Sequence, residues 1–137
     1  MSASLDLARW IRPGDTLTWG QSCAEPSTLV EKLTDQADRL GALRCFVGIP
    51  AKSALTAETV PHRLEVHSYC GAGTNARLHR AGRLEVWPVH YSLFPDLLSA
   101  GGGLAADVVL VQVSPPDEEG RHSLGLGDDY FSAAIDT

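Results

Sequence analysis

Three segments of the sequence have the composition of loops that hold a ligand beside the ends of strands. Residues 20–26 (GQSCAEP), 86–92 (VWPVHYS) and 111–125 (VQVSPPDEEGRHSLG) each continue from a strand-like stretch. Small residues let a ligand approach the backbone, and N–H groups at a helix start can hold an anion or a polarised carbonyl oxygen. Ligands of open α/β sheets lie beyond the carboxyl ends of the strands, so these segments are the candidate site. An ordinary βα turn accounts for residues 20–26 equally well.

The first segment also admits a nucleophile. A strand-turn-helix context would present Ser22 or Cys23 as an attacking group with a later histidine as its base. That motif requires a glycine where Ala24 stands, and Asp117 and His122 fall in one loop instead of forming the rest of a triad. A Ser22 or Cys23 hydrolase is therefore the less favoured interpretation.

Structural roles compete with functional ones in the other two segments. A lone histidine at a strand end, such as His90, is more often structural than ligand-binding. Pro115 and Pro116 fix φ and withhold N–H donors, which makes the exit from the preceding strand rigid. The acidic residues 117–119 are more typical of a solvated turn than of an acid–base pair. The third segment could position a substrate, but it contains no obvious catalyst.

Composition limits the class of protein. The chain has 137 residues, a formal net charge of -6 and no basic run, which argues against a nucleic-acid binder. The apolar run 104–113 is too short to span a bilayer, and residues 1–10 lack the apolar region of a signal peptide. Three widely spaced cysteines form no C-x-x-C pair, so we expect reduced thiols in a cytoplasmic protein and no metal site.

Strand-like and helix-like stretches alternate along the chain. We expect strands at 16–19, 43–49, 62–70, 84–91 and 106–113, with the fourth at a sheet edge because of Pro88. The last is apolar at nearly every residue, which predicts a parallel strand buried on both faces. Apolar residues at helical spacing predict a helix from Pro26 to Leu40, with Thr28 and Glu31 as a capping box and Gly41 as its C-cap.

Shorter helices are expected at 75–81 and 92–99, and residues 128–137 look like the opening turns of another. We take the chain to be part of something longer. Strands separated by helices predict an α/β fold with a mostly parallel open sheet and flanking helices, in a single domain spanning 1–137.

Taken together, the motifs resemble those of the acetyl-CoA hydrolase/transferase family, which includes 4-hydroxybutyrate CoA-transferases. The resemblance rests on AEP at 24–26, HSYCG at 67–71, GR at 82–83, WPVH at 87–90 and, as its most specific part, QVSPPDEEGRHSLG at 112–125. It runs from about residue 14 to the end of the chain and identifies the N-terminal domain of such a protein.

The resemblance implies two related α/β domains with the active site between them. A glutamate of the C-terminal domain would attack an acyl-CoA thioester, and we find no matching glutamate in this chain, which we expect to be inactive alone. The implied role of this domain is one wall of the acyl pocket. The residues expected there are Gly20, Gln21, Ala24, Glu25, Pro26, His90, Ser114 and Pro115.

The same resemblance sets the expected ligands and partners. Coenzyme A thioesters would be substrates, with a carboxylic acid as acceptor and no tightly bound cofactor. The net negative charge agrees with the CoA phosphates being held mainly elsewhere. The partner would be a C-terminal CoA-transferase domain or subunit, in an oligomer with no nucleic acid or membrane. The alternative is a stand-alone binding or assembly module that kept the fold without catalysis.

Overall fold

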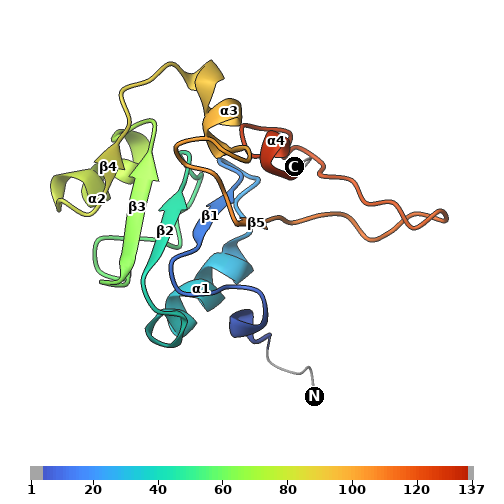
Figure 1. Cartoon of the computed structure of the whole chain (residues 1–137), viewed down its shortest axis with the longest axis horizontal. Helices are drawn as coiled ribbons and strands as arrows, with labels where there is room; N and C mark the ends of the chain where they lie inside the picture. The colour runs from blue at the N-terminus through green and yellow to red at the C-terminus, as the bar shows by residue number, and fades with distance from the viewer. Residues whose placement is uncertain (1–4, 136–137) are drawn as a thin grey trace.

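The computed structural model describes residues 5–135, which form a five-stranded sheet with helices on both faces (Figure 1). The spatial order of the strands is β4-β3-β2-β1-β5, and every pair is parallel. Their bounds are β1 Thr16–Trp19, β2 Leu43–Phe46, β3 Leu64–Ser68, β4 Glu85–Val86 and β5 Val108–Leu110. The predicted α/β fold with an open parallel sheet is confirmed.

Helix α1 (Ser27–Leu40) forms because apolar residues recur on one side of it. Val30, Leu33 and Leu40 are buried against the sheet, as the spacing predicts. Gly41 has a φ of 83°, so the predicted glycine C-cap is confirmed. The capping box is wrong: the N-cap residue is Pro26, and no side chain caps the helix start. Proline fixes its own φ and sets the chain direction there without a side-chain acceptor.

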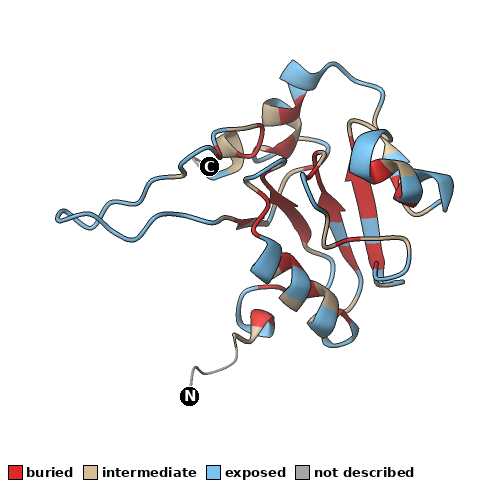
Figure 2. Ribbon diagram, turned by 180° about the vertical axis from the view of Figure 1, so that it is seen from behind, coloured by how far each residue is buried: buried red, intermediate tan, exposed pale blue. Residues whose placement is uncertain are grey.

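Two apolar clusters cover opposite faces of the sheet. Side chains of α1, of α2 (Ala76–Arg80) and of a short 3-10 turn, Leu7–Arg9, pack on the face that contains Leu17, Cys45 and Val66. On the other face, Phe46 packs with α3 (Phe94–Leu98) and with the aromatic residues that precede α4 (Ser132–Ile135). The burial pattern in Figure 2 follows this layering, with red strands between blue outer helix surfaces.

The prediction for residues 106–113 is wrong in its main point. Only Val108–Leu110 pair, and β5 is an edge strand bonded to β1 alone. Leu110 is buried, Val108 and Val109 are half-buried, and Val113 is 41% exposed. An apolar run indicates burial on both faces only if the strand has neighbours on both sides, and within residues 5–135 no strand lies outside β5.

Other elements exist where they were expected but are shorter. Strands β2, β3 and β4 occupy only parts of 43–49, 62–70 and 84–91, and β4 does lie at a sheet edge. Helices α2 and α3 fall inside 75–81 and 92–99, each preceded by a 3-10 turn. Helix α4 begins at Ser132, later than residue 128, and residues 136–137 lie outside the described part.

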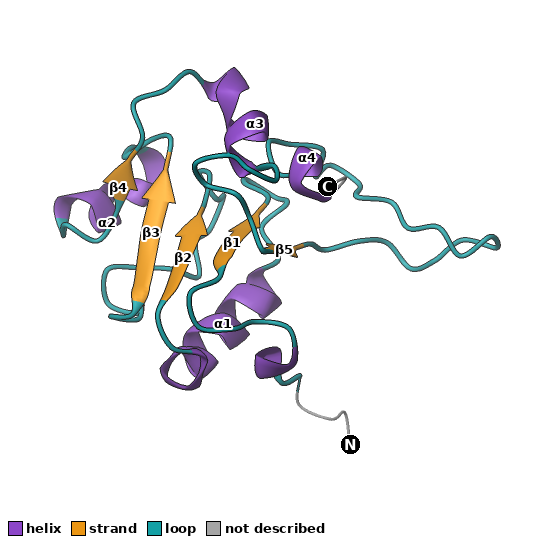
Figure 3. Ribbon diagram, viewed as in Figure 1, coloured by secondary structure: helices purple, strands orange, loops and turns teal. Residues whose placement is uncertain are grey.

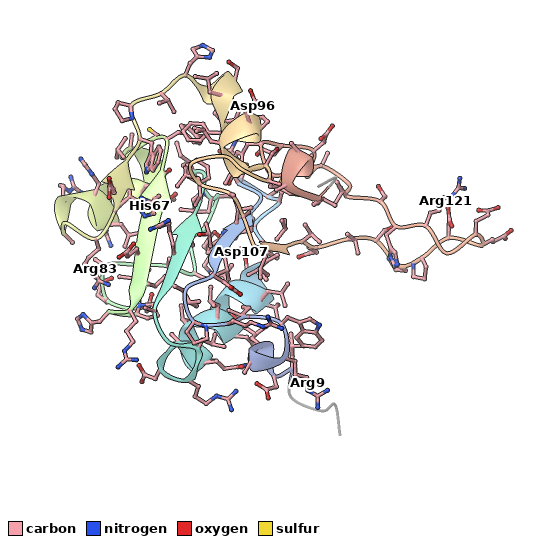
Figure 4. All side chains as sticks on the ribbon, viewed as in Figure 1. Arg9, His67, Arg83, Asp96, Asp107 and Arg121 are labelled. Atoms are coloured by element: carbon pink, nitrogen blue, oxygen red, sulfur yellow. The ribbon has the colours of Figure 1, made fainter. Side chains whose placement is uncertain are left out.

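Between β5 and α4 the chain leaves the body as a long and mostly exposed excursion, residues 111–127, which we call the arm (Figure 3). Its two halves run beside one another, joined by Ser114 N–H to Ser123 O at 2.9 Å and by Asp117 N–H to Arg121 O at 2.9 Å. The guanidinium of Arg121 pairs with Asp117 and Glu119, both at 3.0 Å, far from the sheet (Figure 4). Within residues 5–135 no helix is long and apolar enough to cross a membrane.

Candidate functional site

The carboxyl ends of β1, β2 and β3 are joined by buried polar contacts. Tyr130 donates its hydroxyl to Trp19 O at 2.6 Å and accepts the Gly48 N–H at 2.7 Å. It therefore ties the segment before α4 to the exits of β1 and β2. Burial raises the pKa of the Tyr130 phenol well above its ordinary value, so this hydroxyl stays protonated and can donate.

Gln21 is the centre of a second set of contacts at the same edge. Its Oε1 accepts the Tyr69 hydroxyl at 2.6 Å, and its Nε2 donates to the Tyr91 hydroxyl at 3.0 Å. Tyr91 in turn donates to the Asp129 carboxylate. The Gln21 side chain lies over Gly48, where even a Cβ would collide with it. The Gln21 side chain therefore requires a glycine at position 48. It joins its own turn after β1 to the segments that contain Gly48, Tyr69 and Tyr91.

Asn75 fixes the exits of β2 and β3 to each other. It is 1% exposed, and its Nδ2 donates to Gly48 O at 3.0 Å and to Cys70 O at 3.2 Å. Nearby, Thr74 Oγ1 donates to Pro50 O at 2.8 Å. Buried side-chain bonds of this kind fix loop backbone that has no ladder partner of its own.

A cavity of about 320 Å³ lies between the first predicted segment and the base of the arm. The first segment contributes Cys23 and Ala24, and the arm contributes two stretches, 112–114 and 123–127. Gly127 lies close to the Ala24 side chain. Since β1 and β5 are neighbours, their exits border this cavity, which is the position where parallel sheets bind ligands.

Gly20 serves packing at the same turn. A Cβ there would lie 2.8 Å from the Ala24 Cβ and 2.9 Å from a Phe131 ring carbon. The space beside Gly20 is therefore occupied by the side chains of Ala24 and Phe131, and it is not open to a ligand.

Glu25 and Pro26 point into the body of the domain. Glu25 is 8% exposed and accepts the Ala54 N–H at 3.2 Å. Burial raises the pKa of its carboxyl above the ordinary value, while hydrogen bonds from Ala54 and the Trp19 side chain oppose that shift. Pro26 is buried at the start of α1 and borders a small hollow shared with Val111 and Gln112. Both residues hold the turn to its surroundings.

The remaining predicted residues lie apart from one another. His90 is exposed and caps the Tyr91–Leu93 turn, with its Nδ1 2.8 Å from Ser92 Oγ. Ser114 borders the cavity, and its Oγ accepts the Ser123 N–H at 2.9 Å. Pro115 is exposed on the arm beyond it. Of the eight predicted residues, Ala24 and Ser114 line one cavity, while His90 does not line it.

The geometry also bears on the hydrolase alternative. Ser22 has a φ of 53°, a left-handed conformation that suits a sharp turn, and its backbone bonds to Ile49 and Ala51. Within residues 5–135 no histidine bonds to Ser22 or Cys23. Instead, His67 bonds to Trp87, His90 to Ser92 and His122 to Ser114. No general base is paired with Ser22 or Cys23 in the described part of the chain.

Sequence reasoning missed the aromatic residues of this edge. Tyr69 lies in a quoted motif without a role, and Tyr91 and Tyr130 were not singled out as site residues. Their partners are 38 to 111 positions away in the chain, so no local spacing reveals them. The one available signal is that Tyr69 directly follows β3, at the edge where ligands bind.

Comparison with known proteins identifies relatives of this arrangement. The whole chain, residues 1–137, matches the model of the acetyl-CoA hydrolase/transferase N-terminal domain. RipA from Yersinia pestis is similar, with a TM-score of 0.74 and 27% identity over 90% of this chain and 31% of that one. One point mutant of RipA gives a TM-score of 0.77 and 26% identity over 93% and 31% of the two chains. Another gives 0.76 and 26% over 93% and 32%.

The chain therefore spans about a third of the length of these solved structures. A search of the curated proteins found no match.

Proposed function

Because the chain belongs to the acetyl-CoA hydrolase/transferase N-terminal domain family, we propose that it forms one wall of an acyl-CoA cleft. The parent activity is that of an acyl-CoA:carboxylate CoA-transferase or an acyl-CoA hydrolase. The wall is the carboxyl edge of β1 and β5, with the first predicted segment and the base of the arm. The remaining protein, or a separate subunit, supplies the opposite wall.

One observation carries this proposal: the cavity shared by Ala24 and Ser114. It is bordered by Val113, Leu124 and Leu126, whose side chains suit an acyl group or the methylene chain next to a thioester. Leu126 is 87% exposed, an unusual state for a leucine beside a cavity. A ligand together with a second wall would remove this apolar surface from water.

The chemistry follows from the family resemblance. A glutamate carboxylate attacks the thioester carbonyl, CoA leaves as the thiolate and an acyl-glutamyl anhydride forms. The thiolate then attacks the glutamyl carbonyl, which releases the acyl group as a carboxylate and leaves a glutamyl-CoA thioester. A second carboxylate takes the CoA by the reverse steps, or water hydrolyses the thioester. The attacking glutamate lies outside this chain, so the residues described here act by positioning.

The contacts of Gln21 and Tyr130 support that positioning role. They hold the exits of β1, β2 and β3 in fixed relation, so a ligand at the β1 turn meets a preformed surface. A fixed surface lowers the ordering cost that binding must offset.

Cysteine footprinting tests the wall directly. Cys23 is exposed and borders the cavity, Cys70 is half-buried outside it and Cys45 is buried, so Cys70 is an internal control. We expect a non-hydrolysable thioether analogue of an acyl-pantetheine, which lacks the nucleotide end, to slow alkylation of Cys23 and to leave that of Cys70 unchanged, as measured by peptide mass mapping. Equal rates at Cys23 with and without saturating analogue would refute the proposed wall.

Turnover distinguishes a transferase domain from a stand-alone module. We expect no acyl-CoA turnover by the 137-residue chain alone and turnover when the C-terminal part of a related enzyme is supplied with it. Enzyme-like turnover by the chain alone would overturn the assignment of the nucleophile to another segment. Protection of Cys23 by the analogue, without turnover when the C-terminal part is supplied, would favour a stand-alone binding module that kept the fold and lost the chemistry.

A further inference from the structure

Positive charge is concentrated in one part of an otherwise acidic chain. Residues 50–83 contain five Lys or Arg and two Glu, a net charge of +3, whereas the whole chain has a net charge of -6. Such local segregation creates a positive potential that attracts an anion to one part of the surface. The net charge of the chain therefore says little about this region.

Three of these cations border a single cavity. It has a volume of about 380 Å³ and lies between the chain leaving β2 and the chain leaving β3. Lys52 comes from the first, and Arg77 and Arg80 come from α2. No Asp or Glu borders it, and within residues 5–135 no ion pair engages these three side chains.

A neighbouring cavity shows that this arrangement is not general on the surface. It lies beside β3 and β4, has a volume of about 490 Å³ and is bordered by Arg83 together with Glu65 and Glu85. The Arg83 guanidinium donates to Pro61 O at 2.8 Å, so it already has a partner. In the β2–β3 cavity, by contrast, none of the three cations has an ion-pair partner within residues 5–135, although Arg77 also interacts electrostatically with the exposed Glu58.

The walls of the basic cavity are fixed to each other. Thr74 bonds to Pro50, and Asn75 bonds to Gly48, so both exits are held in place from inside the fold. A Cβ on Gly73, which has a φ of 59°, would lie 3.0 Å from the Ile49 side chain. This close approach and the positive φ both favour glycine and keep the cavity narrow at that point.

The chemistry of the lining selects phosphate. Two guanidinium groups can each present paired N–H donors to phosphate oxygens, and a lysine adds a point charge. We propose that this cavity binds the phosphate groups of the ligand, which for a CoA thioester are those of its 3′-phosphoadenosine diphosphate end. The CoA assignment rests on the proposed function; the phosphate site itself does not.

The position of the cavity fits a ligand that spans the edge of the sheet. Ser22 and Pro50 form a parallel bridge, and Ala51 N–H donates to Ser22 O at 3.3 Å. The basic cavity, which includes Ala51, thus lies on one side of the β1 turn, and the cavity of Ala24 and Ser114 lies on the other. A long ligand could place its phosphates at the β2–β3 exits and its acyl end at the β1–β5 exits.

Calorimetric titration tests this inference with four probes: intact CoA, 3′-phosphoadenosine 5′-phosphate, inorganic pyrophosphate and pantetheine. The test variant is Arg77→Gln with Arg80→Gln, and its control is Arg9→Gln with Arg12→Gln, which changes the net charge equally. We expect the test variant to lose roughly ten-fold or more in affinity for the bisphosphate, because each lost charge-assisted bond is costly, and the control to bind like the wild type. Circular dichroism spectra of both variants serve as the control for folding.

The outcomes separate the phosphate site from the proposed function. No bisphosphate binding, or an equal loss in both variants, overturns the inference even if footprinting of Cys23 succeeds. Bisphosphate and pyrophosphate binding at equal affinity, with no gain from intact CoA, overturns the CoA assignment and leaves a general polyphosphate site. Tighter binding of CoA than of either the bisphosphate or pantetheine supports a ligand that reaches both cavities.

Discussion

The carboxyl edge over β1–β3 and the arm both follow strands of one sheet, yet they are held in opposite ways. At the edge, buried side chains far apart in the sequence bond to each other's backbone, as Tyr130 does to Trp19 and Gly48. Along the arm, the bonds that order its outer part are local, as between Ser114 and Ser123 or Asp117 and Arg121. Figure 2 shows the difference as burial, red at the strands and blue along the arm.

This contrast indicates where each region obtains its order. The edge is stabilised by the same packing that folds the domain, so it is already formed before any ligand arrives. The arm is shaped by its prolines and cross-ribbon bonds, which set its own conformation without burying it. In the proposed cleft, the edge is the fixed surface, and the arm is the part whose apolar base, with Val113 and Leu126, still lacks cover.

Removing the Tyr130 hydroxyl should produce the largest effect. In Tyr130→Phe the Trp19 carbonyl and the Gly48 N–H both lose a buried partner, so we expect the free energy of unfolding to fall by about 2–4 kcal/mol. The control is Tyr91→Phe, whose hydroxyl is more exposed and whose loss should cost about 1 kcal/mol or less. Denaturant unfolding of both variants provides the comparison, and an equal loss would mean that the buried contacts of Tyr130 hold the edge no more tightly than the exposed contacts of Tyr91 do.

The two regions should also differ in the sign of a pH effect. Burial raises the pKa of Glu25 above 4.5, whereas bonds from the Arg121 backbone N–H, the Arg121 side chain and the Glu119 N–H lower that of Asp117 below 3.8. The contribution of Glu25 to stability is thus fully present below its unfolded pKa and is lost as pH rises through its higher folded pKa. For Asp117, whose contacts all lie within the arm, the contribution is to the local order of the arm; it is present above the unfolded pKa and is lost as pH falls through the lower folded one.

Carbon-13 NMR titration of the two carboxyls measures these shifts directly. We expect Glu25 to titrate at a higher pH than an unperturbed glutamate and Asp117 at a lower pH than an unperturbed aspartate. In Glu25→Gln the corresponding loss of stability with rising pH should be absent. Titration of both carboxyls at their ordinary values would remove the electrostatic part of the comparison.

The same contrast explains what could be predicted from the sequence. Helix α1 was predictable because its stripe of Val30, Leu33 and Leu40 depends only on local spacing. The loops of the candidate site were predictable because turn residues mark the strand exits. The burial of β5 was not, because it depends on which strands flank β5 in the sheet, and the run from Val108 to Val113 contains no information about neighbours.

The hydrogen bonds of Gln21 could not be predicted from the sequence for a related reason. Gln21 stands in a predicted segment, but its partners Tyr69 and Tyr91 come from other strand exits and meet it only after the sheet is assembled. Glu25 illustrates the converse: its motif attracted a substrate-binding prediction, whereas the side chain holds residue 54 inside the domain. Which way a turn residue faces is decided by the packing around it, and one sequence does not show that.

Neutralising the tip of the arm should have the smallest effect on the fold. Asp117 accepts the N–H groups of Glu119 and Arg121 and the Arg121 guanidinium, all within the arm. In Asp117→Asn we expect the midpoint of denaturant unfolding to stay unchanged, because none of these contacts reaches the core. Amide hydrogen exchange at Glu119 and Arg121 should become several-fold faster, while exchange at Gly48, bonded to Tyr130, should not change. A shifted unfolding midpoint would show that the arm is coupled to the domain, and the distinction between the two regions would have to be abandoned.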